Sequence, residues 1–130
     1  MQRVYDFLKK ANTYYLATDD HGQPRVRPFG TIDFYEGKLY IQTGRKKDCY
    51  HQMKENPQIE ICAVVDGDWI RVTAKAVENL AIEPEKHMLD AYPSLASMYQ
   101  PGDGNTVVFS LENATATISS FTKEPIVIRW

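Results

Sequence analysis

Cysteine is scarce in this sequence, which contains only Cys49 and Cys62 and no Cys-x-x-Cys pair. Two cysteines are too few for the disulfide framework of a small secreted domain, and without a paired motif they predict neither a metal site nor a redox dithiol. We therefore expect two reduced thiols. The histidines, His21, His51 and His87, are far apart and lack a second ligand at metal-like spacing, so we expect structural or surface roles for them and no bound metal.

Long apolar runs and a strong net charge are also missing. No run approaches the roughly 20 apolar residues of a membrane-spanning helix, and the first stretch, MQRVYDFLKKAN, is too charged for a signal peptide. The net charge of -2 does not favour non-specific attraction to nucleic acid or to an acidic membrane. We expect a cytoplasmic protein with one compact domain over residues 1–130, since this length and 43% hydrophobic residues suffice for one core.

The hydrophobic pattern predicts a mainly β protein with a few helices. A short N-terminal helix is indicated by apolar residues at helical spacing, namely Val4, Phe7, Leu8 and Ala11. Seven β-rich runs follow: TYYLAT, RVRPFGTIDFY, KLYIQT, QIEICAVV, WIRVTAKAV, NTVVFSL and ATATIS. Six or seven strands in an α+β, mainly antiparallel arrangement indicate a barrel or a sandwich.

Turn signals and further helices complete this pattern. Glycines in DDHGQP, EG, DGD and PGDG favour tight turns, and EG and DGD favour hairpins. Alternation in WIRVTAKA directs Trp69 and Arg71 away from the core. Helical spacing recurs at about residues 46–55 and in EPEKHMLDAYPSLASMY, where Pro84 suits a helix start and Pro93 a break.

The stretch QTGRKKDCYHQMKENP has an unusual distribution of charge. Arg45, Lys46 and Lys47 fall in a turn and in the expected first turn of a helix, where unpaired N–H groups are already positive. If residues 26–35 pair with residues 38–47 across the EG turn, Arg25 and Arg27 lie opposite about Lys46.

An anion would make this arrangement favourable. A phosphate at the helix N-terminus would be held by N–H groups and by Thr43, with Gly44 permitting close approach. The alternative is that these cations are solvated at the rim of a small barrel. Neither GxxxxGK[ST] nor GxGxxG occurs, so known phosphate-binding loops of those types are excluded.

Acid–base machinery is sparse in the sequence. Asp48 and His51 are spaced for an ordinary pair on a helix surface, and Asp66 and Asp68 flank a hairpin glycine. A phosphate-bearing cofactor with its own reactivity would explain a protein that supplies cations and aromatic residues yet few catalytic side chains.

Three stretches carry a family resemblance: ATDDHGQPRVRP, TGRKKD and KENPQI leading into a strand. With the N-terminal helix and DWIRVTAKAV, they make the chain resemble, over nearly its whole length, the pyridoxamine 5′-phosphate oxidase-related superfamily of FMN-binding split β-barrels. The most similar branch is that of its short flavin-binding or nitroimidazole-resistance-like members. The resemblance implies a Greek-key split barrel that forms a homodimer with two FMN molecules in clefts at the subunit interface. It also implies electron transfer from a reduced nicotinamide to a small acceptor.

The resemblance also implies a set of cofactor-binding residues. Arg25, Arg27 and Pro28 match the strand that meets the cofactor. Gln42 and Thr43, followed by Gly44, match the flavin-contacting end of the next strand, and Lys46 and Lys47 match the phosphate-binding basic pair. Trp69 matches a cofactor-contacting position contributed by the other subunit, and Arg71 is a weaker candidate beside it.

Two features of the sequence and the diversity of the superfamily leave alternatives open. The chain ends in PIVIRW, without the C-terminal substrate-binding segment of pyridoxamine-phosphate oxidases. Gln42 and Thr43 stand where nitroimidazole-resistance relatives carry a histidine, and other branches of the superfamily bind haem or a deazaflavin. The alternatives are a non-catalytic flavin-binding protein, or a split barrel that binds haem, deazaflavin or another phosphorylated ligand.

Overall fold

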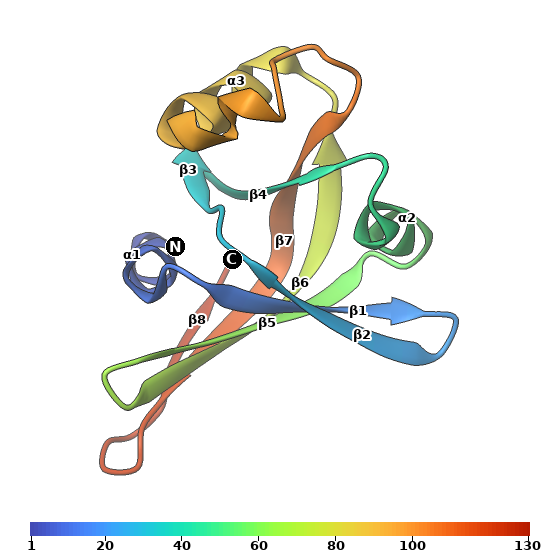
Figure 1. Cartoon of the computed structure of the whole chain (residues 1–130). Helices are drawn as coiled ribbons and strands as arrows, with labels where there is room; N and C mark the ends of the chain where they lie inside the picture. Colours follow the sequence, from blue (N-terminus) through green and yellow to red (C-terminus); the bar gives the residue numbers. More distant parts are fainter.

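The structure, a computed structural model, describes all residues from Met1 to Trp130 and is mainly β (Figure 1). Its elements are, in chain order, α1 (Gln2–Ala11), β1 (Tyr14–Asp20), β2 (Gln23–Phe29), β3 (Asp33–Tyr35), β4 (Lys38–Gly44), α2 (Asp48–Glu55), β5 (Gln58–Val65), β6 (Asp68–Asn79), α3 (Ile82–Ala91), the 3-10 helix η1 (Pro93–Ser97), β7 (Thr106–Ser119) and β8 (Ile126–Arg129). None of these helices has both the length and the apolar character needed to cross a membrane.

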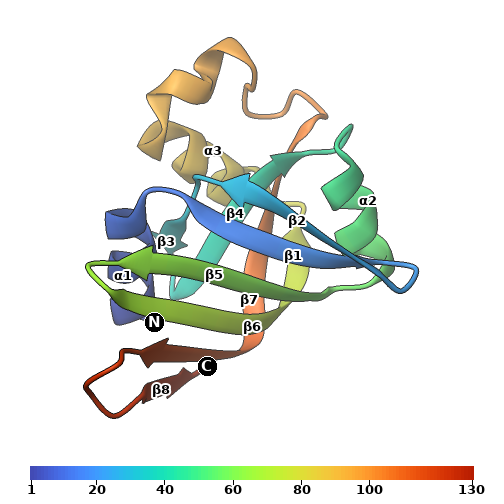
Figure 2. The same cartoon turned by 60° about the horizontal axis from the view of Figure 1, so that its bottom comes forward.

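The eight strands form one antiparallel sheet that curls into an open barrel (Figures 1 and 2). The strand order is β2-β1-β5-β6-β7-β4-β3, and β8 pairs with β7 outside this path. β2 and β3 follow each other in the chain but lie at opposite ends of this order. The two edges of the sheet are therefore joined by residues 30–32 of the chain and not by a ladder of hydrogen bonds, which leaves the barrel split.

Two-residue turns connect three of the hairpins: β1–β2, β3–β4 and β5–β6. Their central pairs are His21-Gly22, Glu36-Gly37 and Asp66-Gly67, and all six residues have positive φ, between 47° and 92°. Positive φ at both central positions is the signature of the type I′ turn, whose twist matches that of the flanking strands. The glycine at the second position of each turn adopts this conformation without the steric cost that a side chain would bring.

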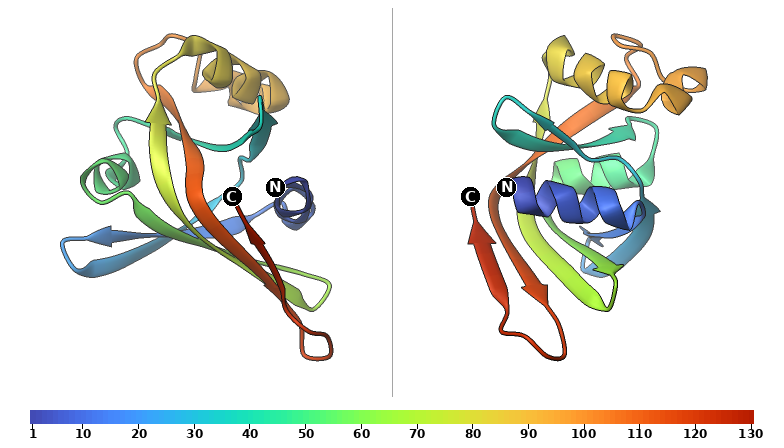
Figure 3. Two further views of the ribbon diagram at one scale, coloured as in Figure 1. Left: turned by 180° about the vertical axis from the view of Figure 1, so that it is seen from behind. Right: turned by 90° about the vertical axis from the view of Figure 1, so that its left-hand side faces the viewer.

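The barrel interior is filled by one cluster of 21 buried hydrophobic residues. β6 contributes the alternate residues expected from its sequence, namely Ile70, Val72, Ala74 and Ala76, and α1 contributes Val4 and Leu8. α1 packs against β5 and β3, α2 against β1 and β4, and α3 against β3, β4 and β7. Figure 3 shows β6 and β7 running from α3 at one end of the molecule to the β7–β8 loop at the other. The expected α+β, mainly antiparallel split barrel is thus confirmed.

The fold differs from expectation in the number of strands. RVRPFGTIDFY contains two strands, because the backbone at residues 31 and 32 is bonded by side chains instead of by a neighbouring strand. The Tyr14 hydroxyl donates to the Thr31 carbonyl (2.6 Å), and the Tyr92 hydroxyl lies 3.0 Å from both the N and the O of Ile32. NTVVFSL and ATATIS are one strand, β7, which carries an extra residue near Asn113 (φ 48°), and β8 is an additional strand.

The expected pairing of residues 26–35 with residues 38–47 is wrong beyond the short hairpin of β3 with β4. β2 pairs instead with β1, so that Arg25 lies opposite Thr18 and Arg27 opposite Leu16, and neither faces Lys46. The helix expected from residue 46 begins at Asp48, and the three cations therefore precede it. The His21-Gly22 turn explains the difference, because it folds β2 directly back on β1.

Candidate functional site

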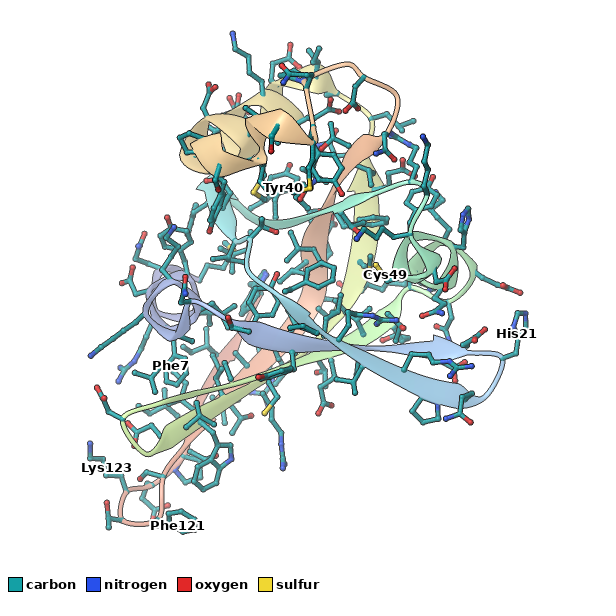
Figure 4. The ribbon with its side chains drawn as sticks, viewed as in Figure 1. Phe7, His21, Tyr40, Cys49, Phe121 and Lys123 are labelled. Carbon is teal, nitrogen blue, oxygen red and sulfur yellow. The ribbon has the colours of Figure 1, made fainter.

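A groove of about 1080 Å³ lies between β2, the end of β4 and α2. Its walls come from residues 25–31, the N-terminal part of α2 and one side of the segment around η1, where Leu95, Met98 and Tyr99 border it. Figure 4 labels two of its lining residues: Cys49 on α2, and His21 at the tip of the β1–β2 hairpin. The groove lies beside β2, an edge strand of the sheet, where α2 packs against β1 and β4.

Arg27 is held in this groove by a closed set of hydrogen bonds. Its Nη2 donates to Gln52 Oε1 (2.6 Å), and its Nη1 donates to Thr18 Oγ1 (2.8 Å) and to the Leu16 carbonyl (3.2 Å). The Thr18 hydroxyl in turn donates to Gln52 Oε1 (2.6 Å). β1, β2 and α2 each contribute one side chain to this set, so the guanidinium is fixed before any ligand arrives.

The N-terminus of α2 presents free hydrogen-bond donors to the groove. The backbone N–H of Tyr50 donates to the Lys47 carbonyl (3.2 Å), but the N–H groups of Asp48 and Cys49 donate to no group of the chain. Such N–H groups carry a partial positive charge. The Asp48 carboxylate is the one acidic group in this first turn, and the Lys47 ammonium precedes it.

Gln42 on β4 supplies an acceptor at the groove. Its side chain is only 6% exposed, and its Nε2 donates to the Thr43 carbonyl and to Thr106 Oγ1, both at 3.1 Å. Because a carbonyl only accepts, this contact fixes which end of the amide is nitrogen. Gln42 borders the groove, and its Oε1 accepts no hydrogen bond from the chain. A ligand N–H or O–H group is the partner it lacks.

The outer end of the groove is closed by exposed ion pairs. Asp20 accepts from Arg25 Nε (3.2 Å) and lies 3.2 Å from His21 Nδ1, while His21 Nε2 lies 2.7 Å from Glu55. Hydrogen bonds to Asp20 and then to Glu55 raise the pKa of His21. The hydrogen bonds from His21 and Arg25 lower the pKa of Asp20. These contacts tie the β1–β2 hairpin to the C-terminal turn of α2.

Six of the nine residues expected to bind a cofactor line this groove: Arg25, Arg27, Pro28, Gln42, Thr43 and Lys47. Gly44 lies just outside it, and a Cβ there would lie 2.9 Å from the Tyr99 hydroxyl and 3.3 Å from Asn105 Oδ1. Because Gly44 has no side chain, the loop that carries Asn105 and the Tyr99 side chain can approach the end of β4 closely. Lys46 is exposed outside the groove, and its N–H donates to Asn105 Oδ1 (3.3 Å).

Arg45 faces away from the groove and has a partner within the chain. Its Nη2 lies 3.0 Å from Glu78 Oε2, and its Nη1 donates to the Thr106 carbonyl (2.8 Å). Lys54 Nζ lies 2.9 Å from the other Glu78 oxygen, and the Glu78 side chain is only 7% exposed. Burial alone would raise the pKa of Glu78, but the Lys54 and Arg45 cations outweigh it and lower the pKa. Part of the apparent anion site is therefore an internal ion-pair network.

Trp69 does not line the groove of its own chain. It is the second residue of β6, and its ring centroid lies 5.1 Å from that of Phe121 in the β7–β8 loop. In Figure 4, Phe121 lies at the end of the molecule opposite His21. Any contact of Trp69 with a cofactor would have to be made in the groove of another subunit.

Sequence reasoning missed Thr18, Gln52 and the groove-lining residues at η1. Gln52 had a usable signal, because it lies four residues after Asp48 and so shares a helix face with the N-terminus. No pattern in the sequence points to Tyr99, because its position depends on a loop far along the chain.

A family model described as pyridoxamine 5′-phosphate oxidase matches residues 1–120. This chain belongs to the pyridoxamine 5′-phosphate oxidase family. A NimC/NimA family protein from Clostridium acetobutylicum has a similar structure, with 41% identity, a TM-score of 0.93 and coverage of 98% of this chain and 93% of that one.

Two more distant structures share the fold of this pyridoxamine 5′-phosphate oxidase family member. General Stress Protein 26 from Bacillus anthracis has 18% identity and a TM-score of 0.76, covering 99% of this chain and 97% of its own. A heme binding protein from Mycobacterium smegmatis has 12% identity and a TM-score of 0.74, covering 96% of this chain and 55% of its own. A comparison with curated protein sequences finds no match.

Proposed function

We propose that this chain binds FMN in the groove between β2 and α2 and acts as an FMN-dependent oxidoreductase, passing electrons from a reduced nicotinamide to a small acceptor. The observation that carries this proposal is the gathering of unused donors around Arg27 and the α2 N-terminus. A phosphate monoester brings close to two negative charges at neutral pH. Arg27, Lys47 and the free N–H groups of residues 48 and 49 are suited to bind it.

The rest of the groove fits a planar, partly polar ring system. Pro28, Phe29, Leu95 and Met98 provide apolar lining, and Gln42 Oε1 offers a fixed acceptor to a ring N–H. When bound, flavin supplies the electron-transfer chemistry. The chain's own residues bind and orient it. Of the carboxylates that border the groove, Asp20 is engaged with Arg25 and Glu55 with His21.

We further propose that the protein works as a homodimer and resides in the cytoplasm. The outward face of β1, β5 and β6 carries exposed apolar side chains, with Tyr15 52% and Val64 65% exposed, and Phe121 beside Trp69 is 92% exposed. Exposed apolar groups gathered in this way favour association. A second copy on this face would bring Trp69 to a groove that its own chain does not offer. Free Cys49 and Cys62 agree with a reducing compartment.

A visible absorption spectrum tests the cofactor directly. The purified chain is incubated with FMN, desalted and scanned, and reduced nicotinamide is then added without oxygen. Retained flavin that bleaches supports the proposal. Retained flavin that stays oxidised would indicate a flavin-binding protein without turnover, and a Soret band after incubation with haemin would indicate the haem alternative. A colourless protein would contradict flavin binding and favour another phosphorylated ligand.

A further inference from the structure

We propose that Gln52 is the residue through which the groove selects a phosphorylated flavin over its unphosphorylated form. This inference rests on the proposed function and adds a specific role for one amide. Gln52 would act in two ways: its oxygen orients Arg27, and its nitrogen contacts the anion directly.

The orientation of the Gln52 amide is fixed by its neighbours. Oε1 receives two short hydrogen bonds, from Arg27 Nη2 and from Thr18 Oγ1, both at 2.6 Å. A guanidinium has donors and no acceptor, so the atom that faces Arg27 must be the oxygen. Thr18 is only 4% exposed, and the Thr18 hydroxyl accepts from Arg27 Nη1 (2.8 Å) as well as donating to Gln52. The three side chains therefore specify one another's orientation.

This orientation leaves the Gln52 nitrogen unused. Nε2 donates to no group of the chain, although Gln52 borders the groove. Asp48, Cys49 and Gln52 all border the groove, so this amide lines the same groove as the residues with free N–H groups, Asp48 and Cys49. Two amide N–H donors, two backbone N–H donors and the Arg27 cation thus border one end of the groove.

An independent feature indicates that this groove holds a ligand. Gln42, a residue that is more than nine-tenths buried, also borders this groove, and its Oε1 accepts no hydrogen bond from the chain. The two glutamines present opposite chemistry: Gln52 offers donors and Gln42 an acceptor. A ligand with an anionic end and an N–H-bearing ring satisfies both.

The test is the ratio of riboflavin to FMN dissociation constants, measured by quenching of flavin fluorescence. Gln52→Leu removes both functions of the amide, and we expect FMN affinity to fall by about 10- to 100-fold while riboflavin affinity stays within about 2-fold. Gln52→Glu keeps oxygen acceptors for Arg27 and Thr18 but replaces the donor, and we expect the same selective loss of FMN. Thr18→Val, which disturbs only the orientation of Arg27, should have a smaller effect.

Gln58→Glu is the matched control, because it makes the same chemical change at an exposed position outside the groove. It should leave the ratio unchanged. An unaltered ratio in both Gln52 variants would overturn the inference, and the near-isosteric Glu variant keeps this outcome accessible if the Leu variant fails to fold. A wild-type protein that binds neither flavin would contradict the proposed function itself. Equal wild-type affinity for the two flavins would leave flavin binding intact and overturn only the role of Gln52.

Discussion

Arg45 and Glu78 form an ion pair with 3.0 Å between Nη2 and Oε2, across 33 residues of sequence. The pair explains why the turn before α2 tolerates so much positive charge. Of its three cations, Arg45 is neutralised inside the chain, Lys46 is solvated, and Lys47 borders the groove. The sequence suggests a single anion for the whole cluster. In the structure, a carboxylate of the chain pairs with one cation, and the proposed phosphate would pair with another.

Glu78→Gln should destabilise the fold by about 1 to 3 kcal/mol at neutral pH, since it removes an ionic acceptor from two cations. The pKa of Glu78 in the folded chain lies below its ordinary value of 4.5. The stabilisation is therefore complete above that value and is lost as pH falls through the lower folded pKa. Urea denaturation at pH 7 and pH 3 measures the difference. A gap between wild type and variant that is as large at pH 3 as at pH 7 would contradict the ion pair.

Lys47→Ala and Lys46→Ala form a matched pair of neighbouring lysines. Lys47 borders the groove and Lys46 does not. We expect Lys47→Ala to weaken FMN binding by about 5- to 10-fold, the value of one partly solvated charge contact, and Lys46→Ala to change it by less than about 2-fold. Fluorescence titrations at two salt concentrations measure both. Equal losses would show that the phosphate lies elsewhere.

Gly44→Ala should destabilise the protein by about 1 to 3 kcal/mol, because the new Cβ would overlap the Tyr99 hydroxyl and crowd Asn105. Gly30→Ala is the control, since a Cβ there meets only the Asn12 carbonyl at 3.8 Å. Combining Gly44→Ala with Tyr99→Phe removes the nearest atom and should restore part of the loss in thermal denaturation. Additive losses in the double variant would exclude this contact as the cause.

Trp69→Ala should weaken both self-association and FMN binding if Trp69 reaches a partner's groove. Leu80→Ala is the control: Leu80 is 80% exposed but follows the far end of β6. Light scattering over a range of concentrations gives the mass, and flavin titration gives the affinity. A wild-type chain that is monomeric at all concentrations would contradict the dimer, and a dimeric Trp69 variant with full FMN affinity would contradict the cofactor contact.

Local patterns in the sequence predict much of the fold. Helical spacing predicts α1, glycines predict the tight turns, and Pro93 marks the end of α3 and the start of η1. The break between β2 and β3 is not visible locally, because the hydroxyls that satisfy its backbone belong to Tyr14 and Tyr92, 17 and 60 residues away. When contacts with distant residues end a strand, the sequence alone predicts one continuous strand there.

The residues of the candidate site also differ in how well the sequence predicts them. The alternation of Arg25 and Arg27 and the position of Lys47 identify groove residues, since these depend on strand period and on a turn. Arg45 misleads, because its partner is brought near only by the pairing of β6 with β7 and of β7 with β4. Gln52 is overlooked for a similar reason: its significance depends on the bond to Arg27, which tertiary structure alone supplies.

The central claim is that Arg27 holds the phosphate of a flavin in this groove. Calorimetric titration of wild type and Arg27→Met with FMN tests it most directly. We predict binding of about one FMN per chain for the wild type and an affinity loss of about 10- to 100-fold for the variant, the value of charge-assisted hydrogen bonds. Equal affinity in the two proteins, or no binding by a folded wild-type chain, would contradict the claim.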